Sequence, residues 1–272
     1  MPKVMVCGRG GSGKSTLVSL LAHRLSERAR VLVVDADESN FGLNTMIGLE
    51  PPVKTVMDFL GGKSAVREKL MMWLRSGGDE KMQIFREGLS LESLPEVFLS
   101  AKANLSLVRI GKIEHSMEGC ACPMGAVARS FLETLTVDKG EWVLIDTEAG
   151  IEHFGRGVLE GVDYVLVVVD PSKEAVLLAD KACRMSKEAG KDWGVVLNKV
   201  ENKITDILEG KLEQLGLSPL GHVPYSDRIV AQNLEGEPIG DKRIWDELDR
   251  ILSNIESQIR SRAGPGEHGV IS

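Results

Sequence analysis

The sequence predicts an α/β protein built on a mostly parallel sheet of seven strands, with helices on both faces. Short β-branched runs alternate with longer amphipathic stretches, which is the pattern of repeated strand–helix units. One run, 165–169, is apolar throughout, as expected for a central strand that is covered on both faces. A glycine-rich segment, 8–13, joins the first apolar run to the first helical pattern.

The alternation places the individual elements. Strands are expected at 3–7, 31–35, 105–110, 142–146, 164–169, 193–197 and 219–223, and helices at 14–28, 54–60, 63–75, 124–135, 172–189, 203–215 and 242–261. The stretch 51–119 follows the alternation least well and is expected to be a partly helical insertion with one strand. We expect one domain over 1–262 and a disordered tail over 263–272, which is rich in glycine.

Composition narrows the class of protein. The 272 residues are 43% hydrophobic and 27% charged, with a net charge of −7. This balance argues against a general nucleic-acid binder, and no apolar run approaches the length of a membrane span. The N-terminus does not resemble a signal peptide, and four cysteines do not indicate a secreted disulfide framework. We therefore expect a cytoplasmic protein that binds neither nucleic acid nor membrane.

The glycine-rich segment has the spacing G-x-x-x-x-G-K-S and lies between a strand and a helix. In that context backbone N–H groups converge on phosphate oxygens at the positive end of the helix. Lys14 is expected to reach the outer phosphates, and the Ser15 hydroxyl to bind Mg²⁺. The residues expected to surround the nucleotide are Gly10, Gly11, Ser12, Gly13, Lys14, Ser15 and Thr16. Motif and context together predict the P-loop NTPase fold.

Aspartates close three of the expected strands, at Asp35, Asp146 and Asp170. Asp146 is followed four residues later by Gly150, a spacing that suits a segment holding Mg²⁺ near the terminal phosphate. Asp35 and Asp37 offer two further carboxylates, one for a magnesium-bound water and one for the attacking water. We assign the attacking water to Asp37. The alternative is that Asp37 only caps the turn that follows it.

A fourth strand ends in Asn198-Lys199-Val200-Glu201. This nearly spells the N-K-x-D motif that reads guanine, but glutamate stands where aspartate is expected. The Asn198 amide alone suits adenine. ATP is therefore the expected nucleotide, and GTP stays open as the alternative.

Arg9 through Ser15 resembles the deviant Walker A motif of the MinD/ParA/nitrogenase-iron-protein ATPases. The segments 35–37 and 146–150 are similar to that family's switch segments, and Val223-Pro224-Tyr225 is similar to its adenine-side loop. The resemblance implies slow, dimer-dependent ATP hydrolysis by a homodimer that encloses two ATP molecules, with Pro224 beside the adenine. It also implies that the residue at position 9 crosses to the partner's phosphates and acts with Lys14 and Asp37. The family has lysine there. Arg9 keeps the charge and can bind phosphate through two hydrogen bonds.

Two further segments resemble CooC-type nickel-insertion ATPases. One is 149–157, directly after Asp146, and the other is 119–123, Gly-Cys-Ala-Cys-Pro, which is preceded by 108–113. The resemblance implies an ATP-dependent metallochaperone. Its client would be a nickel enzyme such as carbon monoxide dehydrogenase or acetyl-CoA synthase.

The cysteine pair Cys120 and Cys122 also has a physical interpretation of its own. One pair supplies two thiolates, whereas a tetrahedral or square-planar site takes four ligands. A twofold axis beside the loop would bring a second pair and complete a site for Ni²⁺ or Zn²⁺, between which the residues do not choose. His115 and Met117 are nearby candidates for ligands, and His153 for a contact near the switch segment. Cys7 and Cys183 are expected in the core.

Two alternatives remain for the function. A MinD/ParA-like positioning ATPase, which acts on membrane or DNA, predicts a basic patch or a terminal amphipathic anchor, and the sequence shows neither. An iron–sulfur redox or carrier ATPase also needs four thiolates across a dimer. It predicts a visible absorption band in protein purified without oxygen.

Overall fold

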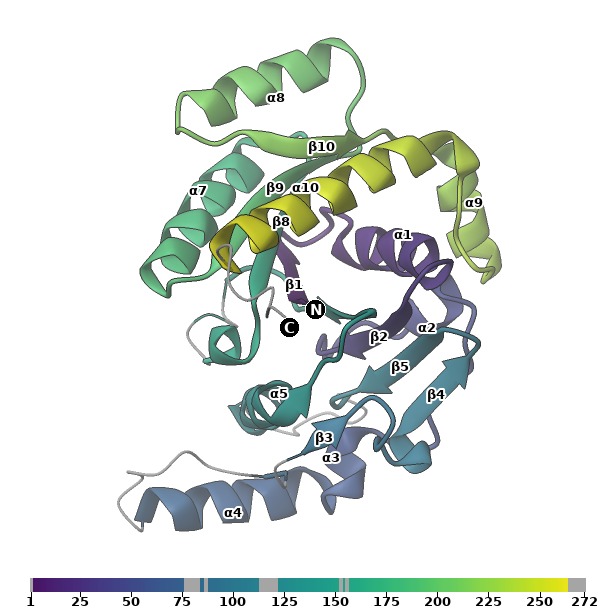
Figure 1. Cartoon of the computed structure of the whole chain (residues 1–272), viewed down its shortest axis with the longest axis vertical. Helices are drawn as coiled ribbons and strands as arrows, with labels where there is room; N and C mark the ends of the chain where they lie inside the picture. The colour runs from purple at the N-terminus through teal and green to yellow at the C-terminus, as the bar shows by residue number, and fades with distance from the viewer. Residues whose placement is uncertain are drawn as a thin grey trace, which may run out of the picture.

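The computed structural model describes residues 2–75, 84–85, 88–112, 122–151, 154 and 157–263. Its central feature is an eight-stranded sheet in the order β10-β9-β8-β1-β7-β2-β5-β4 (Figure 1). The strands are β1 (Lys3–Gly8), β2 (Arg30–Asp35), β4 (Leu99–Lys102), β5 (Leu105–Arg109), β7 (Glu141–Asp146), β8 (Tyr164–Val169), β9 (Asp192–Asn198) and β10 (Pro219–Val223). All seven expected strands are present and parallel, which confirms the predicted α/β fold.

The strand count differs from the prediction by one, because β4 adds an antiparallel edge strand beside β5. A second small sheet pairs β3 (Leu89–Ser90) with β6 (Leu135–Thr136). The described residues of the stretch 51–119 therefore contain three strands, β3, β4 and β5, where one was expected. The sequence of β4, Leu-Ser-Ala-Lys, contains no β-branched residue, so it lacks the composition that marks a strand.

The helices follow the predicted pattern closely. They are α1 (Lys14–Ser26), α2 (Leu43–Met46), α3 (Val56–Phe59), α4 (Gly62–Arg75), α5 (Cys122–Thr134), α7 (Lys173–Glu188), α8 (Lys203–Glu213), α9 (Asp227–Glu235) and α10 (Trp245–Ala263), with 3₁₀ turns η1 (Glu96–Phe98), η2 (Val158–Gly161) and η3 (Lys242–Ile244). The prediction missed the four-residue helix α2 and the helix α9. α9 has only nine residues, of which only Ile229 is buried, and it is shorter than the window over which helical periodicity is recognised in a sequence.

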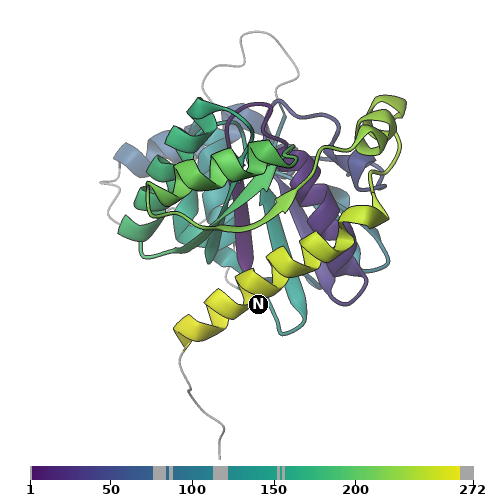
Figure 2. The same ribbon diagram turned by 90° about the horizontal axis from the view of Figure 1, so that it is seen from above.

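Two hydrophobic cores lie on opposite faces of the sheet, because successive side chains of a strand point to opposite sides. Val4 and Val6 of β1 pack in the core that α1 and α10 cover. Met5 and Cys7, which alternate with them, pack in the core that α5 and α7 cover. Figure 2 shows α10 on one side of the strands and α7 and α8 on the other. This two-sided burial explains the apolar run in β8.

The carboxyl ends of the parallel strands lie at one edge of the sheet. β1 ends at Gly8, β2 at Asp35, β7 at Asp146 and β9 at Asn198. β1 pairs with β7 on one side and β8 on the other, so the glycine-rich loop leaves the sheet near its middle. Ligands of such folds gather at this edge. In the described part of the chain, no helix combines the length and apolar character that crossing a membrane requires.

Candidate functional site: a nucleotide and magnesium site at the strand ends

The loop 9–13 connects β1 to α1, and the segment 8–13 requires glycine at both of its ends. Gly13 has φ 93°, and a Cβ atom there would lie 2.2 Å from Asn198 Nδ2. Gly8 has φ 150°, and its Cβ would lie 2.6 Å from the Val168 carbonyl oxygen. Both positions combine a backbone conformation that favours glycine with a close neighbour. The glycines therefore let the loop fold tightly against β8 and β9.

Side chains from the end of β9 support this loop from outside. Asn198 Nδ2 donates to the Ser12 carbonyl over 2.7 Å, and Lys199 Nζ donates to the Gly11 carbonyl over 2.7 Å. Lys14 Nζ lies within the loop and donates to the Arg9 carbonyl over 3.3 Å. Asn198 is thus a contact of the phosphate loop itself. Its expected contact with adenine stays a prediction, and the supporting role of Lys199 was not foreseen.

The first turn of α1 meets the end of β7 at the expected magnesium site. Ser15 Oγ donates to Asp146 Oδ2 over 2.6 Å. Asp146 is fully buried, and its Oδ1 has no hydrogen-bond partner. Burial raises the pKa of Asp146 to about 7, while the hydrogen bond from Ser15 opposes that shift. An unpaired buried carboxylate oxygen beside a serine hydroxyl is a donor set that fits Mg²⁺, which prefers hard oxygen ligands.

Asn40 belongs to this site, although sequence reasoning did not identify it. Asn40 Nδ2 donates to Ser15 Oγ over 2.8 Å and lies 3.3 Å from Asp146 Oδ2. Its own side-chain oxygen accepts from the Gly42 N–H over 2.9 Å. A single asparagine after an acidic segment carries no motif, so only the fold could show that it reaches the P-loop.

Asp37 lies on the same loop, 37–40, after β2. Its Oδ1 accepts hydrogen bonds from the Ser39 N–H over 2.8 Å and the Ser39 hydroxyl over 2.7 Å. The capping interaction considered as the alternative is therefore present. The side chain is largely buried, with 9% of its surface exposed. Its assignment to the attacking water stays a prediction.

Asp35, at the end of β2, is fully buried between two cations. Lys112 Nζ lies 2.7 Å from Asp35 Oδ2, and Arg109 Nε lies 3.6 Å from it. Burial raises the pKa of Asp35 to about 6, and the charge of Lys112 acts against this rise. Both cations belong to the segment 108–113, which resembles CooC-type proteins, but the sequence analysis predicted no role for either of them. The expected contribution of Asp35 to magnesium binding stays a prediction.

Arg9 makes contacts within its own chain. Its Nε lies 3.7 Å from Asp170 Oδ2 and 3.8 Å from Glu174 Oε2. Asp170 follows β8, and Glu174 lies in the first turn of α7. The third strand-terminal aspartate thus faces the arginine and not the magnesium site. The predicted contact of Arg9 with a partner subunit is not tested by these contacts.

The remaining predicted residues fall into two groups. Pro224 directly follows β10, at the same edge of the sheet as Asn198. Cys120, His115, Met117 and His153 lie outside the described residues, and Cys122 is described only as the first residue of α5. In the described ranges, no group of three or more His, Cys, Asp or Glu side chains is arranged to hold a metal.

The other two cysteines are buried, as expected. Cys7 and Cys183 are free thiols in the core on the α7 side of the sheet. Burial raises the pKa of each to about 12, so neither is a thiolate near neutral pH.

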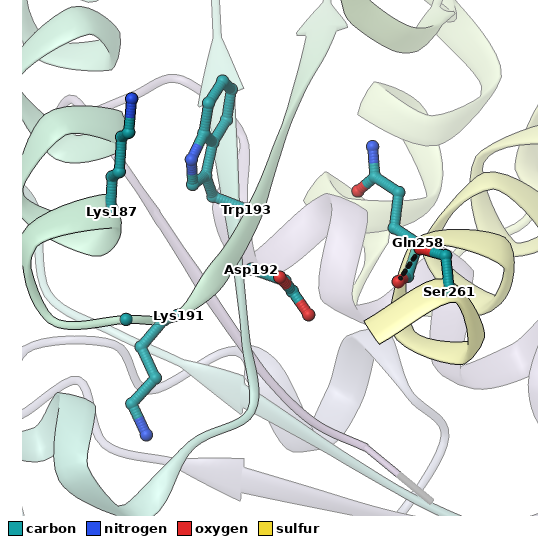
Figure 3. A pocket seen from close by; sticks show the side chains of 7 residues that line it. Lys187, Lys191, Asp192, Trp193, Gln258 and Ser261 are labelled. Atoms are coloured by element: carbon teal, nitrogen blue, oxygen red, sulfur yellow. Dashed lines mark hydrogen bonds between the residues drawn. The ribbon is translucent and has the colours of Figure 1, made fainter. Parts of the chain in front are cut away.

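A surface hollow of about 480 Å³ lies near the opposite end of β9, away from the nucleotide edge (Figure 3). It is lined by Lys187, Gly190, Lys191, Asp192, Trp193, Gln258 and Ser261. Lys191 Nζ donates to the Val162 carbonyl over 2.7 Å, so this ammonium group of the hollow already has a partner within the chain. The hollow contains none of the residues predicted for nucleotide chemistry.

These features define a P-loop nucleotide-binding protein. They are the glycine-rich loop before α1, Lys14 at the start of that helix, and the Ser15–Asp146 pair at the strand ends. Residues 3–239 match the CbiA family, described as the CobQ/CobB/MinD/ParA nucleotide binding domain. The chain belongs to this family. It is an ATPase of the MinD/ParA type, in agreement with the ATP-binding relatives described next.

Comparison with known proteins refines this assignment. The chain is 39% identical over 260 residues to the ATP-binding protein MJ0084 of Methanocaldococcus jannaschii, covering 94% of this chain and 98% of the relative. It is 31% identical over 238 residues to the carbon monoxide dehydrogenase accessory protein CooC of Rhodospirillum rubrum, covering 86% and 88%. The structure of MinD with Mg-ADP from Pyrococcus horikoshii has the same fold, with a TM-score of 0.65, 19% identity and coverage of 97% and 100%.

Proposed function

We propose that this ATPase is a metallochaperone that delivers nickel to an enzyme such as carbon monoxide dehydrogenase or acetyl-CoA synthase. In this proposal ATP closes a homodimer, and the two cysteine pairs Cys120 and Cys122 together form one metal site. Nickel is the cargo that the protein carries, and Zn²⁺ is the alternative ion for the same thiolates.

The observation that carries the proposal is the cysteine pair within a chain that is 31% identical to a carbon monoxide dehydrogenase accessory protein. The position of the pair supports it. The chain leaves the nucleotide site at Lys112, whose ammonium group contacts the loop 37–40, and Cys122 begins α5. Only nine residues, 113–121, separate the two points. A change at the nucleotide therefore has a short covalent route to the thiols.

The proposal also assigns roles in ATP hydrolysis to residues of the site. Lys14 and the backbone N–H groups of residues 10–16 bind the phosphates of ATP. Ser15 and Asp146 would hold Mg²⁺, with Asp35 beside them, and the ion would neutralise charge on the transferred phosphate. Asp37 orients the attacking water, and Asn198 and Pro224 contact the adenine.

Arg9 is the proposed link between the two subunits. In the single chain its guanidinium group lies near Asp170 and Glu174. In the ATP-bound dimer it would leave these carboxylates for the partner's phosphates, which offer more negative charge and two hydrogen bonds. ATP thus favours the closed dimer through its differential interaction with Arg9, and hydrolysis removes that preference.

The decisive experiment is an anaerobic titration with Ni²⁺ and with Zn²⁺, followed by equilibrium dialysis and thiolate absorption, with and without a non-hydrolysable ATP analogue. The wild type is compared with the double variant Cys120→Ala/Cys122→Ala. We expect about one ion for each two chains in the wild type with nucleotide, and loss of this binding in the variant. Cys183→Ala is the matched control, because it removes a thiol that is buried in the core.

Equal metal binding by the wild type and the double variant would contradict the proposal. A visible absorption band in protein purified without oxygen would favour the iron–sulfur alternative. Nucleotide-dependent binding to lipid vesicles or DNA, with no specific metal binding, would favour a positioning ATPase of the kind that MinD and ParA represent.

A further inference from the structure

The 37–40 loop is held by a lysine from a distant part of the chain. Lys112 follows β5 and is almost fully buried, with 8% of its surface exposed. Lysine is rarely buried unless its charge is paired. Here the ammonium group lies 2.7 Å from Asp35 Oδ2 and donates to the carbonyl oxygens of Asp37 and Asn40. The ammonium group thus forms one ion pair and two hydrogen bonds, which keep its charge paired despite its burial.

Two of these contacts are not needed to neutralise a carboxylate. Asp35 already has a second cation, Arg109, whose Nε lies 3.6 Å from its Oδ2. The carbonyls of Asp37 and Asn40 lie at the two ends of the loop, so Lys112 joins them to one point. From that loop, the Asn40 amide reaches Ser15 Oγ over 2.8 Å. A continuous set of hydrogen bonds thus runs from Lys112 to the magnesium site.

We propose that Lys112 is a positioning residue for ATP hydrolysis, which holds the 37–40 loop so that Asp37 and Asn40 face the P-loop. The inference rests on the proposed role of Asp37 in orienting water. Lys112 contacts two backbone carbonyls of the loop and touches none of the P-loop residues in these interactions. Its removal should therefore slow the chemical step more than it weakens ATP binding.

The test is steady-state ATP hydrolysis by Lys112→Gln, compared with Arg109→Gln. Both substitutions remove one cation beside Asp35, but only Lys112 contacts the 37–40 loop; Arg109 instead donates to the Asn44 side chain. We expect kcat of Lys112→Gln to fall by about 10-fold to 100-fold, because misplacement of a catalytic group has effects of this size. The KM for ATP should change by less than about threefold, and Arg109→Gln should retain kcat within about threefold.

A second measurement separates positioning from a loss of stability. Lys112→Arg keeps a positive charge beside Asp35, but its planar guanidinium group cannot reproduce the ion pair and both carbonyl hydrogen bonds in the same geometry. It should keep the thermal midpoint of the wild type while its kcat falls. Amide hydrogen exchange at residues 39–42 should become faster in both variants, while exchange in α1 stays unchanged.

Three outcomes overturn the inference, and the third is distinguishable from the first two. If Asp37→Asn loses hydrolysis while Lys112→Gln and Lys112→Arg keep wild-type kcat, Lys112 has no positioning role. The same conclusion follows if Arg109→Gln lowers kcat as much as Lys112→Gln does. If Asp37→Asn itself keeps wild-type kcat, both the proposed role of Asp37 and the inference are wrong.

Discussion

The Ser15 hydroxyl donates to Asp146 Oδ2 over 2.6 Å and so joins the first turn of α1 to the end of β7. This pair brings together residues that are 131 positions apart in the sequence. Because Asp146 Oδ1 has no hydrogen-bond partner, the pair retains an open acceptor for a hard cation.

The first prediction concerns Ser15→Ala. It should remove the increase in ATP affinity that Mg²⁺ causes, about tenfold or more, and leave ATP affinity in EDTA unchanged. Titration of a fluorescent ATP analogue with and without Mg²⁺ measures both values. The matched control is Ser19→Ala, one turn along α1, where the hydroxyl donates only to the Ser15 carbonyl. Equal loss of affinity with and without Mg²⁺ would show that Ser15 does not act through the ion.

The second prediction concerns the acidic partners of Arg9. Glu174 is 75% exposed, and its Oε2 lies 3.8 Å from Arg9 Nε, so the pair stabilises the single chain only slightly. Glu174→Gln should release Arg9 and tighten ATP-dependent dimerisation by about twofold to fivefold. Sedimentation velocity with a non-hydrolysable analogue measures the dimer dissociation constant.

The control for this prediction is Asp180→Asn, a change of the same charge on the same helix, where the carboxylate pairs with Arg184 at 2.6 Å. It should leave dimerisation unchanged. Arg9→Ala should abolish the ATP-dependent dimer altogether. If the two acidic variants behave alike, general charge and not the release of Arg9 controls the association.

The third prediction concerns Gly13→Ala. The new Cβ would lie 2.2 Å from Asn198 Nδ2 at a φ of 93°, so the loop must change its shape. ATP affinity should fall by about tenfold or more, while the rest of the fold stays intact. Adding Asn198→Ala relieves the clash but not the strained backbone, and should restore little binding. Gly210→Ala in α8, which has open space around it, should bind ATP normally.

Much of the fold could be predicted because the pattern of apolar residues within each of these strands indicates how the strand is buried. β8 is apolar throughout and β1 alternates between two cores, so local patterns were sufficient. β4 could not be found in this way because its residues are not typical of strands and it lies at the sheet edge. α9 was missed because its nine residues are fewer than a helical periodicity needs to be recognised.

For the site, too, residues marked by a local sequence pattern could be predicted, and residues brought together by the fold could not. The P-loop is contiguous in sequence, so its spacing alone predicted the phosphate cradle. Asn40 reaches Ser15 from the loop that follows β2, and Lys112 reaches that loop because β2 and β5 are neighbours in the sheet. Lys112 binds backbone carbonyls, which every residue has, so nothing in the sequence of the 37–40 loop marks its partner.

The junction before α10 contains a buried carboxylate with a lowered pKa. Asp241 is 3% exposed, accepts from the Ser226 hydroxyl over 2.8 Å and from Arg243 Nη2 over 2.6 Å. The hydrogen bonds from Arg243 are the main cause that holds the pKa of Asp241 well below its usual range. Ser226 caps α9 and Asp241 caps η3, the turn that leads into α10, so the hydrogen bond between them joins the two caps.

The fourth prediction follows from the sign of that shift. A carboxylate whose pKa is lowered in the folded protein stabilises it fully above the unfolded value, about pH 4, and loses this effect as the pH falls further. Asp241→Asn should therefore lower the free energy of unfolding by about 1 kcal/mol at pH 5 to 8, and by progressively less below pH 4. Urea unfolding followed by circular dichroism at several pH values measures the difference. Glu235→Gln, an exposed change at the end of α9, should show no such dependence. If the loss of unfolding free energy caused by Asp241→Asn stayed constant down to pH 3, the shape of the Asp241 side chain and not its charge would be the stabilising property.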